Sequence, residues 1–418
     1  MSKLRIAVWH NLPSGGAKRV LWHFIDGLVK RGHYVEAWCP STANQKYLSL
    51  GTVCRENILP LTLPEDKKKP LPMTGWASDV RTMRARIIAM REHCRQCAEQ
   101  MTAGGFDVLM SNSCATFIMP SIARYVKMPK AMILGEPNRR LFEALPEVVW
   151  AAPAPQGNGQ VTASFGRLLR DTLKLKHLRM QMREEIENAK YFDSILVNSF
   201  FSRESVLRAY GLESEVCYLG VDTAQFRPTG EAKENYLIGL GSVHHHKGVD
   251  RAIRAVATVP AAQRPKLIWV GNDSNEQTTR EYRELAKGLG VDLEIKVMVT
   301  DAELVSLLSR ATAMLYTSRL EPFGLAPLEA NACGTPVVGV AEGGVRESMV
   351  PGENGLLAAD ARPETIGAIL RELLDNPARL AALSRHCRAA METRWSMEGA
   401  VTRLEDSLNN LIKEKSRK

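Results

Sequence analysis

The sequence predicts two doubly wound α/β domains, each with a parallel sheet covered by helices, and three observations support this. In both halves of the chain, short apolar runs alternate with amphipathic stretches. This pattern is typical of strands that are each followed by a crossover helix. The connections are short, which favours right-handed crossovers between parallel strands. The chain has 418 residues, 45% of them hydrophobic and 24% charged, which fits a globular protein of two or three domains.

The first half begins with an apolar run at residues 4–9, which we interpret as a buried strand. A loop with Gly15 and Gly16 leads to an amphipathic helix over about residues 17–31, and Gly32 ends that helix. A second strand follows at residues 34–38. Further strands are predicted at residues 106–110, 131–134 and 194–198.

The second half repeats this pattern with cleaner signals. Its strands are predicted at residues 236–240, 266–270, 293–297, 313–316 and 336–340, and its helices at 249–259, 278–288, 301–310 and 324–333. Residues 220–228 lack periodicity and end on a proline, so we expect a hinge there. The apolar stripe Val401, Leu404, Leu408 and Leu411 predicts a final helix. We therefore divide the chain into domains at 1–218 and 219–394, followed by a C-terminal helical segment at 395–418.

Two segments of the first domain, near residues 64–103 and 145–190, exceed what a minimal sheet requires. In the first, apolar residues recur at steps of three and four and predict a helix of about six turns, with the seam Val80, Met83, Ile87, Met90, Cys94, Cys97 and Met101. We interpret this seam as core packing rather than a surface for a partner helix. The second segment has a stretch rich in Pro, Gly and Ala, followed by a basic helix.

The net charge of +9 lies entirely in the first half. Residues 1–200 hold 28 Lys and Arg against 17 Asp and Glu, whereas residues 201–418 hold 27 against 29. Much of the surplus falls in the two insertions, at Lys67–Lys69, Arg81, Arg84, Arg86, Arg91, Arg95, Arg167, Arg170, Lys174, Lys176, Arg179 and Arg183. We therefore expect the first domain to meet an anionic partner.

Eight cysteines spread over the chain do not form a disulfide scaffold, so we expect reduced and mostly buried thiols. The pair Cys94 and Cys97 has no second pair to complete a metal site and lies on the helical seam. No apolar run approaches the roughly 20 residues of a spanning helix, and the first strand is too short for a secretory signal. We expect a cytoplasmic protein.

A glycine-containing loop follows the first strand of each half, at the carboxyl edge where open α/β sheets bind ligands, and the loop of the second half also carries a lysine. The residues are Gly15 and Gly16 in the first half, and Gly241, Ser242 and Lys247 in the second. Glycine lets a ligand approach the backbone closely, and lysine offers a point charge to a diphosphate. The two loops together suggest a sugar nucleotide held between the domains.

Two carboxylates, Glu321 and Glu329, flank a helix start expected near Gly324. The unpaired N–H groups of a first helical turn and the helix dipole favour a phosphate at such a point. Glu329 would lie on the crevice-facing side of the helix, where its carboxylate can accept hydrogen bonds from sugar hydroxyls. Glu321, in the preceding loop, can reach a second polyol.

Taken together, these motifs resemble those of retaining glycosyltransferases of family 4, which have the two-domain GT-B fold. The resemblance rests on SGGAKRV (14–20), VNS (197–199), YLGVD (218–222), Gly241 with Lys247-Gly248, EPFGLAPLE (321–329), GTPVV (334–338), GGVRE (343–347) and GENG (352–355). It covers the C-terminal half almost throughout and the N-terminal half in patches. It implies a cleft between the domains and a final helix that crosses back to the first domain.

The resemblance also implies roles for matching residues. Lys247 looks like the lysine that neutralises the donor diphosphate, Glu329 like the ribose-binding glutamate, and Glu321 like the glutamate near the transferred sugar. The backbone of Phe323, Gly324 and Leu325, and that of Gly16, should approach the phosphates. The implied reaction retains the anomeric configuration, uses a UDP- or GDP-linked sugar, and needs no metal or other cofactor.

The sequence departs from the family pattern in two places. Where many relatives have an arginine just after Gly241, this chain has Ser242, and Arg319 or the His244–His246 run are candidates to replace that charge. Where many relatives have an active-site histidine, this chain reads Gly135-Glu136-Pro137, which resembles a subgroup variant. We assign no catalytic histidine and take Glu136 as a candidate catalytic residue beside Lys247 and Glu321.

The run His244–His246 also admits a metal site, which we reject. Successive loop residues point in different directions, and no carboxylate or cysteine stands nearby at ligand spacing. A loop that lines the donor phosphates is the better interpretation.

The leading functional hypothesis is a glycosyltransferase whose acceptor, a lipid-linked or polysaccharide glycan, binds the basic first domain, with an anionic membrane surface as a further partner. Two alternatives stay open. Transfer to modified bases of a nucleic acid would use the basic insertions, although aromatic residues are only 6% of the chain and are not interleaved with the basic ones. A sugar-nucleotide-binding protein with degraded catalysis would explain Ser242 and Gly135.

Overall fold

A computed structural model describes residues 3–64, 75–143, 165–272 and 274–417. The chain divides into two compact units, each of which is described by itself. Unit 1 comprises Met1–Val197, Arg203–Val216 and Leu404–Lys418, and unit 2 comprises Asn198–Ser202 and Cys217–Arg403. Asn198–Ser202, which the sequence analysis assigned to the first domain, thus groups with the second unit.

Unit 1 is built on a seven-stranded parallel sheet with the strand order β3-β2-β1-β4-β5-β6-β7. Its strands are β1 (Arg5–Asn11), β2 (Tyr34–Pro40), β3 (Arg55–Leu59), β4 (Val108–Cys114), β5 (Lys130–Leu134), β6 (Ser194–Val197) and β7 (Glu215–Val216). The sequence analysis missed β3 and β7. Both are short edge strands that mix charged with apolar residues, so neither produces the apolar run that marks a buried strand.

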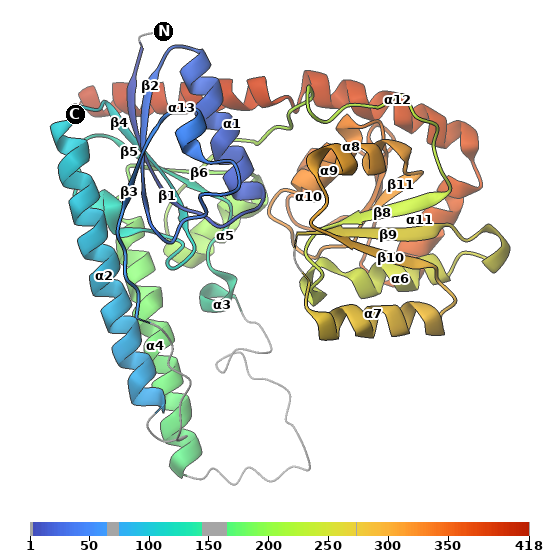
Figure 1. Cartoon of the computed structure of the whole chain (residues 1–418), viewed down its shortest axis with the longest axis horizontal. Coiled ribbons are helices and arrows are strands. Elements are labelled where there is room, and N and C mark those ends of the chain that lie inside the picture. Colours follow the sequence, from blue (N-terminus) through green and yellow to red (C-terminus); the bar gives the residue numbers. More distant parts are fainter. Residues whose placement is uncertain (1–2, 65–74, 144–164, 273, 418) are drawn as a thin grey trace. The chain divides into compact units, whose positions relative to one another are not determined.

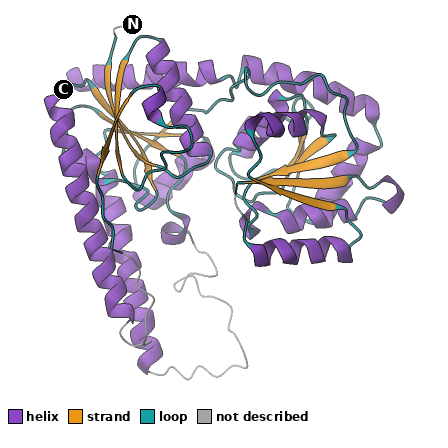
Figure 2. Ribbon diagram, viewed as in Figure 1, coloured by secondary structure: helices purple, strands orange, loops and turns teal. Residues whose placement is uncertain are grey.

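Helices flank this sheet (Figure 2). They are α1 (Gly16–Lys30), α2 (Gly75–Ala103), α3 (Arg139–Phe142), α4 (Phe165–Ala189) and α5 (Phe200–Tyr210), with single turns of 3₁₀ helix at Leu50–Thr52 and Ser121–Arg124. The two insertions are thus long helices, and α2 and α4 pack side by side (Figure 1). Six residues of α1 are buried on one face, as its amphipathic pattern predicted.

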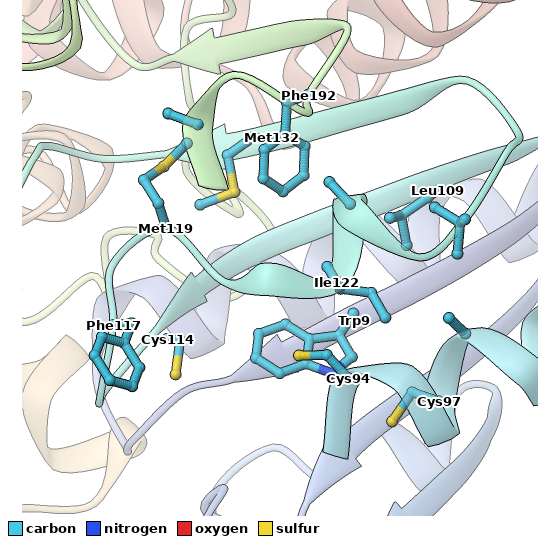
Figure 3. Close-up of a cluster of buried hydrophobic side chains, with 14 of the residues drawn as sticks. Trp9, Cys94, Cys97, Leu109, Cys114, Phe117, Met119, Ile122, Met132 and Phe192 are labelled. Atoms are coloured by element: carbon cyan, nitrogen blue, oxygen red, sulfur yellow. The ribbon is translucent and has the colours of Figure 1, made fainter. Parts of the chain in front are cut away.

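The predicted seam of α2 lies in the core of unit 1. Met83, Met90, Cys94, Cys97 and Met101 are buried and pack in one cluster with residues of the sheet. Figure 3 shows Cys94, Cys97 and Trp9 among the side chains of this cluster. The interpretation as core packing is therefore confirmed. All eight cysteines are free, and seven of them are buried, as expected for reduced thiols.

Several insertion arginines are engaged in contacts within unit 1. Arg91 binds the carboxylate of Glu184, with its Nε 2.9 Å from Oε1, and Arg95 pairs with Glu92 and Glu99 on its own helix. Arg81, Arg84, Lys176, Arg179 and Arg183 are exposed. The lysine run at 67–69, most of the stretch that precedes α4, and the side chains of Arg167, Arg170 and Lys174 lie outside the described residues.

Unit 2 contains a six-stranded parallel sheet with the order β10-β9-β8-β11-β12-β13. Its strands are β8 (Tyr236–Leu240), β9 (Lys266–Gly271), β10 (Leu293–Val297), β11 (Ala313–Tyr316), β12 (Val337–Val340) and β13 (Gly355–Ala358). Five of these match predicted strands to within a residue. The sequence analysis missed β13, which has only four residues and begins on a glycine.

Four helices of unit 2 lie where the amphipathic stretches predicted them, and three more follow. They are α6 (Val249–Ala257), α7 (Glu276–Gly288), α8 (Asp301–Arg310), α9 (Leu325–Ala332), α10 (Val345–Ser348), α11 (Pro363–Leu374) and α12 (Pro377–Thr393), with 3₁₀ turns at His245–Lys247 and Ala261–Gln263. Side-chain caps at Asn275, Thr300 and Asn376 begin α7, α8 and α12.

The predicted hinge at residues 220–228 is wrong, because this segment packs within unit 2. Phe226 is buried in the apolar core, and Arg388 of α12 donates to the carbonyl oxygens of Phe226 and Thr223. Val221 pairs with Ser396 in an isolated bridge. A segment without periodicity can still be ordered when its backbone groups find partners in another element.

The final helix, α13 (Met397–Ser416), returns to the first unit as expected, since Leu404–Lys418 belong to unit 1. There Glu405 pairs with Arg31 at 2.7 Å and with His33 Nε2 at 2.9 Å. Leu404, Leu408 and Leu411 are buried. None of the helices in the described ranges combines the length and the apolar composition that a bilayer crossing demands.

Candidate functional site

Lys247 and Glu321 meet at the carboxyl edge of the unit 2 sheet. Lys247 ends the 3₁₀ turn after β8, and Glu321 lies in the loop after the neighbouring strand β11. The lysine Nζ is 2.9 and 3.1 Å from the two carboxylate oxygens. The two side chains are 22% and 21% exposed, so both can still meet a ligand. Two candidate catalytic residues are thus brought together.

Glycines shape the loop that carries Lys247. Gly241 has φ 152°, and a Cβ there would lie 3.2 Å from the lysine Cγ. Gly248 has φ 75°, and a Cβ there would lie 2.5 Å from the carbonyl oxygen of Thr317. Side chains are strained at such φ values, so these two positions favour glycine.

Thr317 and Arg251 fasten this loop to the end of β11, and the sequence analysis singled out neither. The Thr317 hydroxyl donates to the carbonyl oxygen of Gly248 at 2.8 Å, and Arg251 donates from Nε and Nη2 to the carbonyl oxygen of Thr317 at 3.1 and 3.0 Å. Nothing in the sequence pattern marks these residues, because each binds a backbone group that is distant in sequence.

A second pair of glycines holds the loop that carries Glu321. The N–H of Gly344 donates to the Glu321 carbonyl oxygen at 2.8 Å. A Cβ at Gly343 would lie 2.4 Å from that same oxygen, and one at Gly344 would lie 1.9 Å from the carbonyl oxygen of Pro322. The Ser199 hydroxyl also donates to Pro322 O, at 2.5 Å. The loop is therefore held by backbone contacts that leave no space for a side chain.

Helix α9 begins directly after this loop. Gly324, with φ 91°, is its N-cap, and no side chain caps the first turn or adds a carboxylate to it. Its first N–H groups therefore suit an anion. Phe323 is buried, Leu325 is partly exposed, and the buried Glu329 follows in the second turn.

Two tyrosines next to the loop stay protonated. Burial, and then the charge of Glu321, raises the pKa of Tyr316 above its ordinary value. Burial and a hydrogen bond to Glu347 raise the pKa of Tyr218 to about 12, and its hydroxyl lies 2.9 Å from that carboxylate. Glu347 also accepts the N–H groups of Phe200 and Phe201 at 2.8 and 3.0 Å.

The candidates to replace the missing arginine at Ser242 have other contacts. Arg319 donates from Nε to the carboxylate of Glu342, and His245 Nδ1 lies 3.0 Å from the hydroxyl of Tyr282. The rings of His244 and His246 stack at 5.9 Å. Within the described residues, none of these histidines belongs to a group of three potential metal ligands.

The remaining predicted site residues, Gly15, Gly16 and Glu136, belong to unit 1. Gly15 has φ 137°, caps α1 without a side chain, and leaves open space where a Cβ would stand. Glu136 follows β5 and accepts a hydrogen bond from Arg139 Nε at 2.7 Å. Both loops lie at the carboxyl edge of the unit 1 sheet, after β1 and β5, and the sequence analysis expected this for the Gly15 loop.

A buried carboxyl lies on α4 in the same unit. Glu185 of α4 is fully buried, and its Oε1 accepts from Ile118 N at 3.3 Å and from Gln181 Nε2 at 3.1 Å. Burial raises the pKa of Glu185 to about 7, although the hydrogen bonds from Gln181 and Ile118 oppose the shift. The carboxyl is therefore neutral in the folded protein at acidic pH.

We expect Glu185 to make folding stability fall as the pH rises from 4.5 to about 7. Above pH 4.5 the carboxyl loses its proton in the unfolded chain but keeps it in the folded protein. Deprotonation therefore stabilises the unfolded state relative to the folded one. The loss amounts to about 3 kcal/mol by about pH 8. Urea unfolding of Glu185→Gln and wild type should be compared at pH 4.5 and at pH 8. Between these two pH values, the free energy of unfolding of the variant should rise by about 3 kcal/mol relative to that of wild type. Glu187→Gln, exposed on the same helix, should show no such gain, and a gain of equal size there would contradict the assignment.

Part of the chain matches a known family. Residues 221–390 match the model of the family described as "Glycosyl transferases group 1". A "D-inositol 3-phosphate glycosyltransferase 1" from Catenulispora acidiphila is 32% identical over 213 residues, which cover 46% of this chain and 51% of that protein. A "Glycogen synthase" from Mycobacterium tuberculosis is 30% identical over 214 residues, covering 48% and 49%. The chain thus spans about half the length of the curated relatives it matches.

Solved structures share the fold over nearly the whole chain. Sucrose-phosphate synthase from Thermosynechococcus elongatus aligns with a TM-score of 0.69 at 17% identity, covering 98% of this chain and 100% of that one. HepE from Anabaena, solved with UDP, also aligns with a TM-score of 0.69 at 17% identity, covering 97% and 100%. WaaG, described as involved in lipopolysaccharide biosynthesis, aligns with a TM-score of 0.63 at 17% identity, covering 96% and 99%. The predicted architecture of two Rossmann-like domains, the GT-B fold, is confirmed.

Proposed function

We propose that this chain, in which residues 221–390 carry a glycosyl transferases group 1 domain, is a retaining glycosyltransferase. It moves a hexose from a UDP- or GDP-linked donor to an acceptor and needs no metal for the transfer. The observation that carries the proposal is the Lys247–Glu321 pair, held at 2.9 Å by glycine loops next to the free N-terminus of α9. The HepE structures with UDP and with UDP-glucose support a sugar nucleotide as the donor.

The donor diphosphate would bind where unit 2 concentrates positive electrostatic potential. Lys247 supplies a full charge, and the first N–H groups of α9 supply oriented dipoles. As the bond between the anomeric carbon and the phosphate oxygen breaks, negative charge grows on the leaving phosphate. Donors already in position stabilise that charge without reorganisation.

Glutamates would hold the hydroxyl groups of the donor. Glu329, buried on α9, suits the ribose, and Glu321 suits the transferred sugar. Lys247 keeps Glu321 oriented in the absence of ligand, and a bound diphosphate would compete for the lysine. Glu136 of unit 1 is our candidate for a further catalytic residue, and Gly15 and Gly16 for backbone contacts to the phosphates.

We place the acceptor on the basic unit 1. Exposed Arg81, Arg84, Lys176, Arg179 and Arg183 on α2 and α4 favour an anionic partner, and a lipid-linked or polysaccharide glycan at an anionic membrane surface meets that requirement. The ion pairs of Arg91 and Arg95 disfavour a nucleic-acid acceptor, because those charges are already balanced within the protein. A cytoplasmic site, peripheral to the inner membrane face, fits this role.

A panel of UDP- and GDP-sugars tests the proposal. We expect one donor to raise the melting temperature, and nucleoside diphosphate to be released when a membrane extract is added as the source of acceptor. Chelator should leave the rate unchanged, and NMR of the product should show a retained anomeric configuration. Stabilisation without turnover would favour a binding protein with degraded catalysis. If no sugar nucleotide either stabilises or reacts, the proposal is wrong.

A further inference from the structure

A compact group of polar side chains lies in unit 1, apart from the proposed donor residues of unit 2. His10 is on β1, Cys39 on β2 and Glu56 on β3, three neighbouring strands. Val8 pairs with Ala37 and Ala37 with Glu56, so that all three side chains share one face of the sheet. His10 and Cys39 are fully buried, and the side chain of Glu56 is 4% exposed. Such a group needs a partner for each polar atom.

The three potential ligand atoms converge. His10 Nε2 is 3.2 Å from Glu56 Oε1, and Cys39 Sγ is 3.5 Å from the same oxygen. One atom from each residue lies within 4.8 Å of the other two. In a tetrahedral zinc site, bond lengths of about 2.0–2.3 Å imply a nitrogen–oxygen separation of about 3.3 Å and a sulfur–oxygen separation of about 3.6 Å. The observed separations are those of a ligand set that could close on an ion with little movement.

Neighbouring groups orient the side chains of Glu56 and Cys39 in the way that metal ligands are oriented. The other carboxylate oxygen of Glu56 accepts from Ser49 Oγ at 3.2 Å and from Gly51 N at 3.0 Å. Gln45 Nε2 donates to Cys39 Sγ at 3.2 Å. Hydrogen bonds of this kind fix the direction of first ligands and tune their basicity.

The charges of a divalent ion would balance in this group. A thiol that binds the ion gives up its proton, and the imidazole binds through Nε2. Thiolate and carboxylate then neutralise the ion.

One neighbour opposes a cation. Lys18, in the first turn of α1, is buried, and its Nζ has no hydrogen-bond partner within the described ranges. Replacing Lys18 by a neutral residue would favour an ion in the adjacent group, and this gives a way to tell a metal site from a hydrogen-bonded cluster.

We propose that His10, Cys39 and Glu56 form a site for a divalent transition-metal ion, with Zn²⁺ the best match to this nitrogen, sulfur and oxygen ligand set. The fourth position is left for water or another small ligand. The site ties three strands together beneath α1, and thus stabilises unit 1 near the Gly15 loop. The ion takes no part in the sugar transfer proposed above.

Titration of the chelator-treated, full-length protein with Co²⁺ tests the site. We expect one ion per chain, a thiolate-to-cobalt charge-transfer absorption that Zn²⁺ removes, and release of one proton per ion. Cys39→Ser should abolish the absorption, and the isosteric Glu56→Gln should weaken binding by at least about tenfold. Zn²⁺ should raise the melting temperature of wild type more than that of either variant. Lys18→Met should tighten binding.

Cys97→Ser is the matched control. Cys97 is also a buried thiol, 3.5 Å from His93 Nε2, but among the described residues that pair has no third ligand. The Cys97→Ser variant should therefore bind cobalt as wild type does. The proposal is overturned if wild type binds no cobalt through sulfur, or if the absorption survives in both Cys39→Ser and Glu56→Gln. None of these readouts depends on glycosyl transfer, so failure here leaves the proposed function untouched.

Discussion

Replacing Lys247 by methionine is expected to lower kcat/KM for the sugar-nucleotide donor by about 10²–10³-fold. Methionine keeps the unbranched stem that packs against Gly241 but removes the charge that the leaving diphosphate needs. Steady-state kinetics with the best donor of the panel would measure this loss. Most of it should appear in kcat, because the negative charge on the phosphate is greatest in the transition state.

Two further variants separate this role from a structural one. Lys266→Met removes a lysine of the same sheet that pairs with Glu294 at 2.8 Å, and it should leave the rate within about twofold, because that pair is exposed. Glu321→Gln breaks the ion pair from the other side. If Lys247 served only to hold Glu321, the double variant would be no slower than Glu321→Gln alone. That outcome would contradict the direct role.

The second large effect is expected at Gly344. Its φ lies in the ordinary helical region, so the substitution acts through contact alone. A methyl group at Gly344 would lie 1.9 Å from the carbonyl oxygen of Pro322, a backbone atom that cannot rotate away. We expect Gly344→Ala to lower the free energy of unfolding by about 3 kcal/mol and to weaken donor binding, since the Glu321 loop must shift. Denaturant unfolding and donor-induced thermal shifts would measure both.

Gly288→Ala is the control for Gly344→Ala. Gly288 ends α7 in the same unit, has no positive φ, and has open space where a Cβ would stand. Its replacement should leave stability unchanged or slightly improved, because alanine is the better helix former. If both variants lose the same free energy of unfolding, the loss at Gly344 does not come from its close contact with the Glu321 loop.

The periodicity of the sequence was enough to predict both sheets. Buried parallel strands such as β8 and β11 are continuous apolar runs, and amphipathic helices such as α6 carry one apolar face. Both signals are local. The edge strand β3 gave no such signal, because it exposes Arg55 and Ile58 to solvent and owes its order to pairing with β2.

The hinge prediction failed for a related reason. Residues 220–228 have no pattern of their own and are ordered by contacts with α12, through Arg388 and the buried Phe226. Arg91 shows the same limit. Its charge was evident in the sequence, but its partner Glu184 is 93 residues away, on a helix that packs beside α2 only in the folded protein.

The sequence by itself determined the two-domain α/β architecture, the packing seam of α2, and the identity of Lys247, Glu321 and Glu329 as candidates, because residue type and spacing are local properties. Tertiary structure alone decided which of them meet. The Lys247–Glu321 pair, the Thr317 and Arg251 contacts, and the convergence of His10, Cys39 and Glu56 all join residues that are distant in the sequence. Parallel strands bring such atoms to one edge or one face only through long crossovers, so register and packing, rather than spacing along the chain, set their distances.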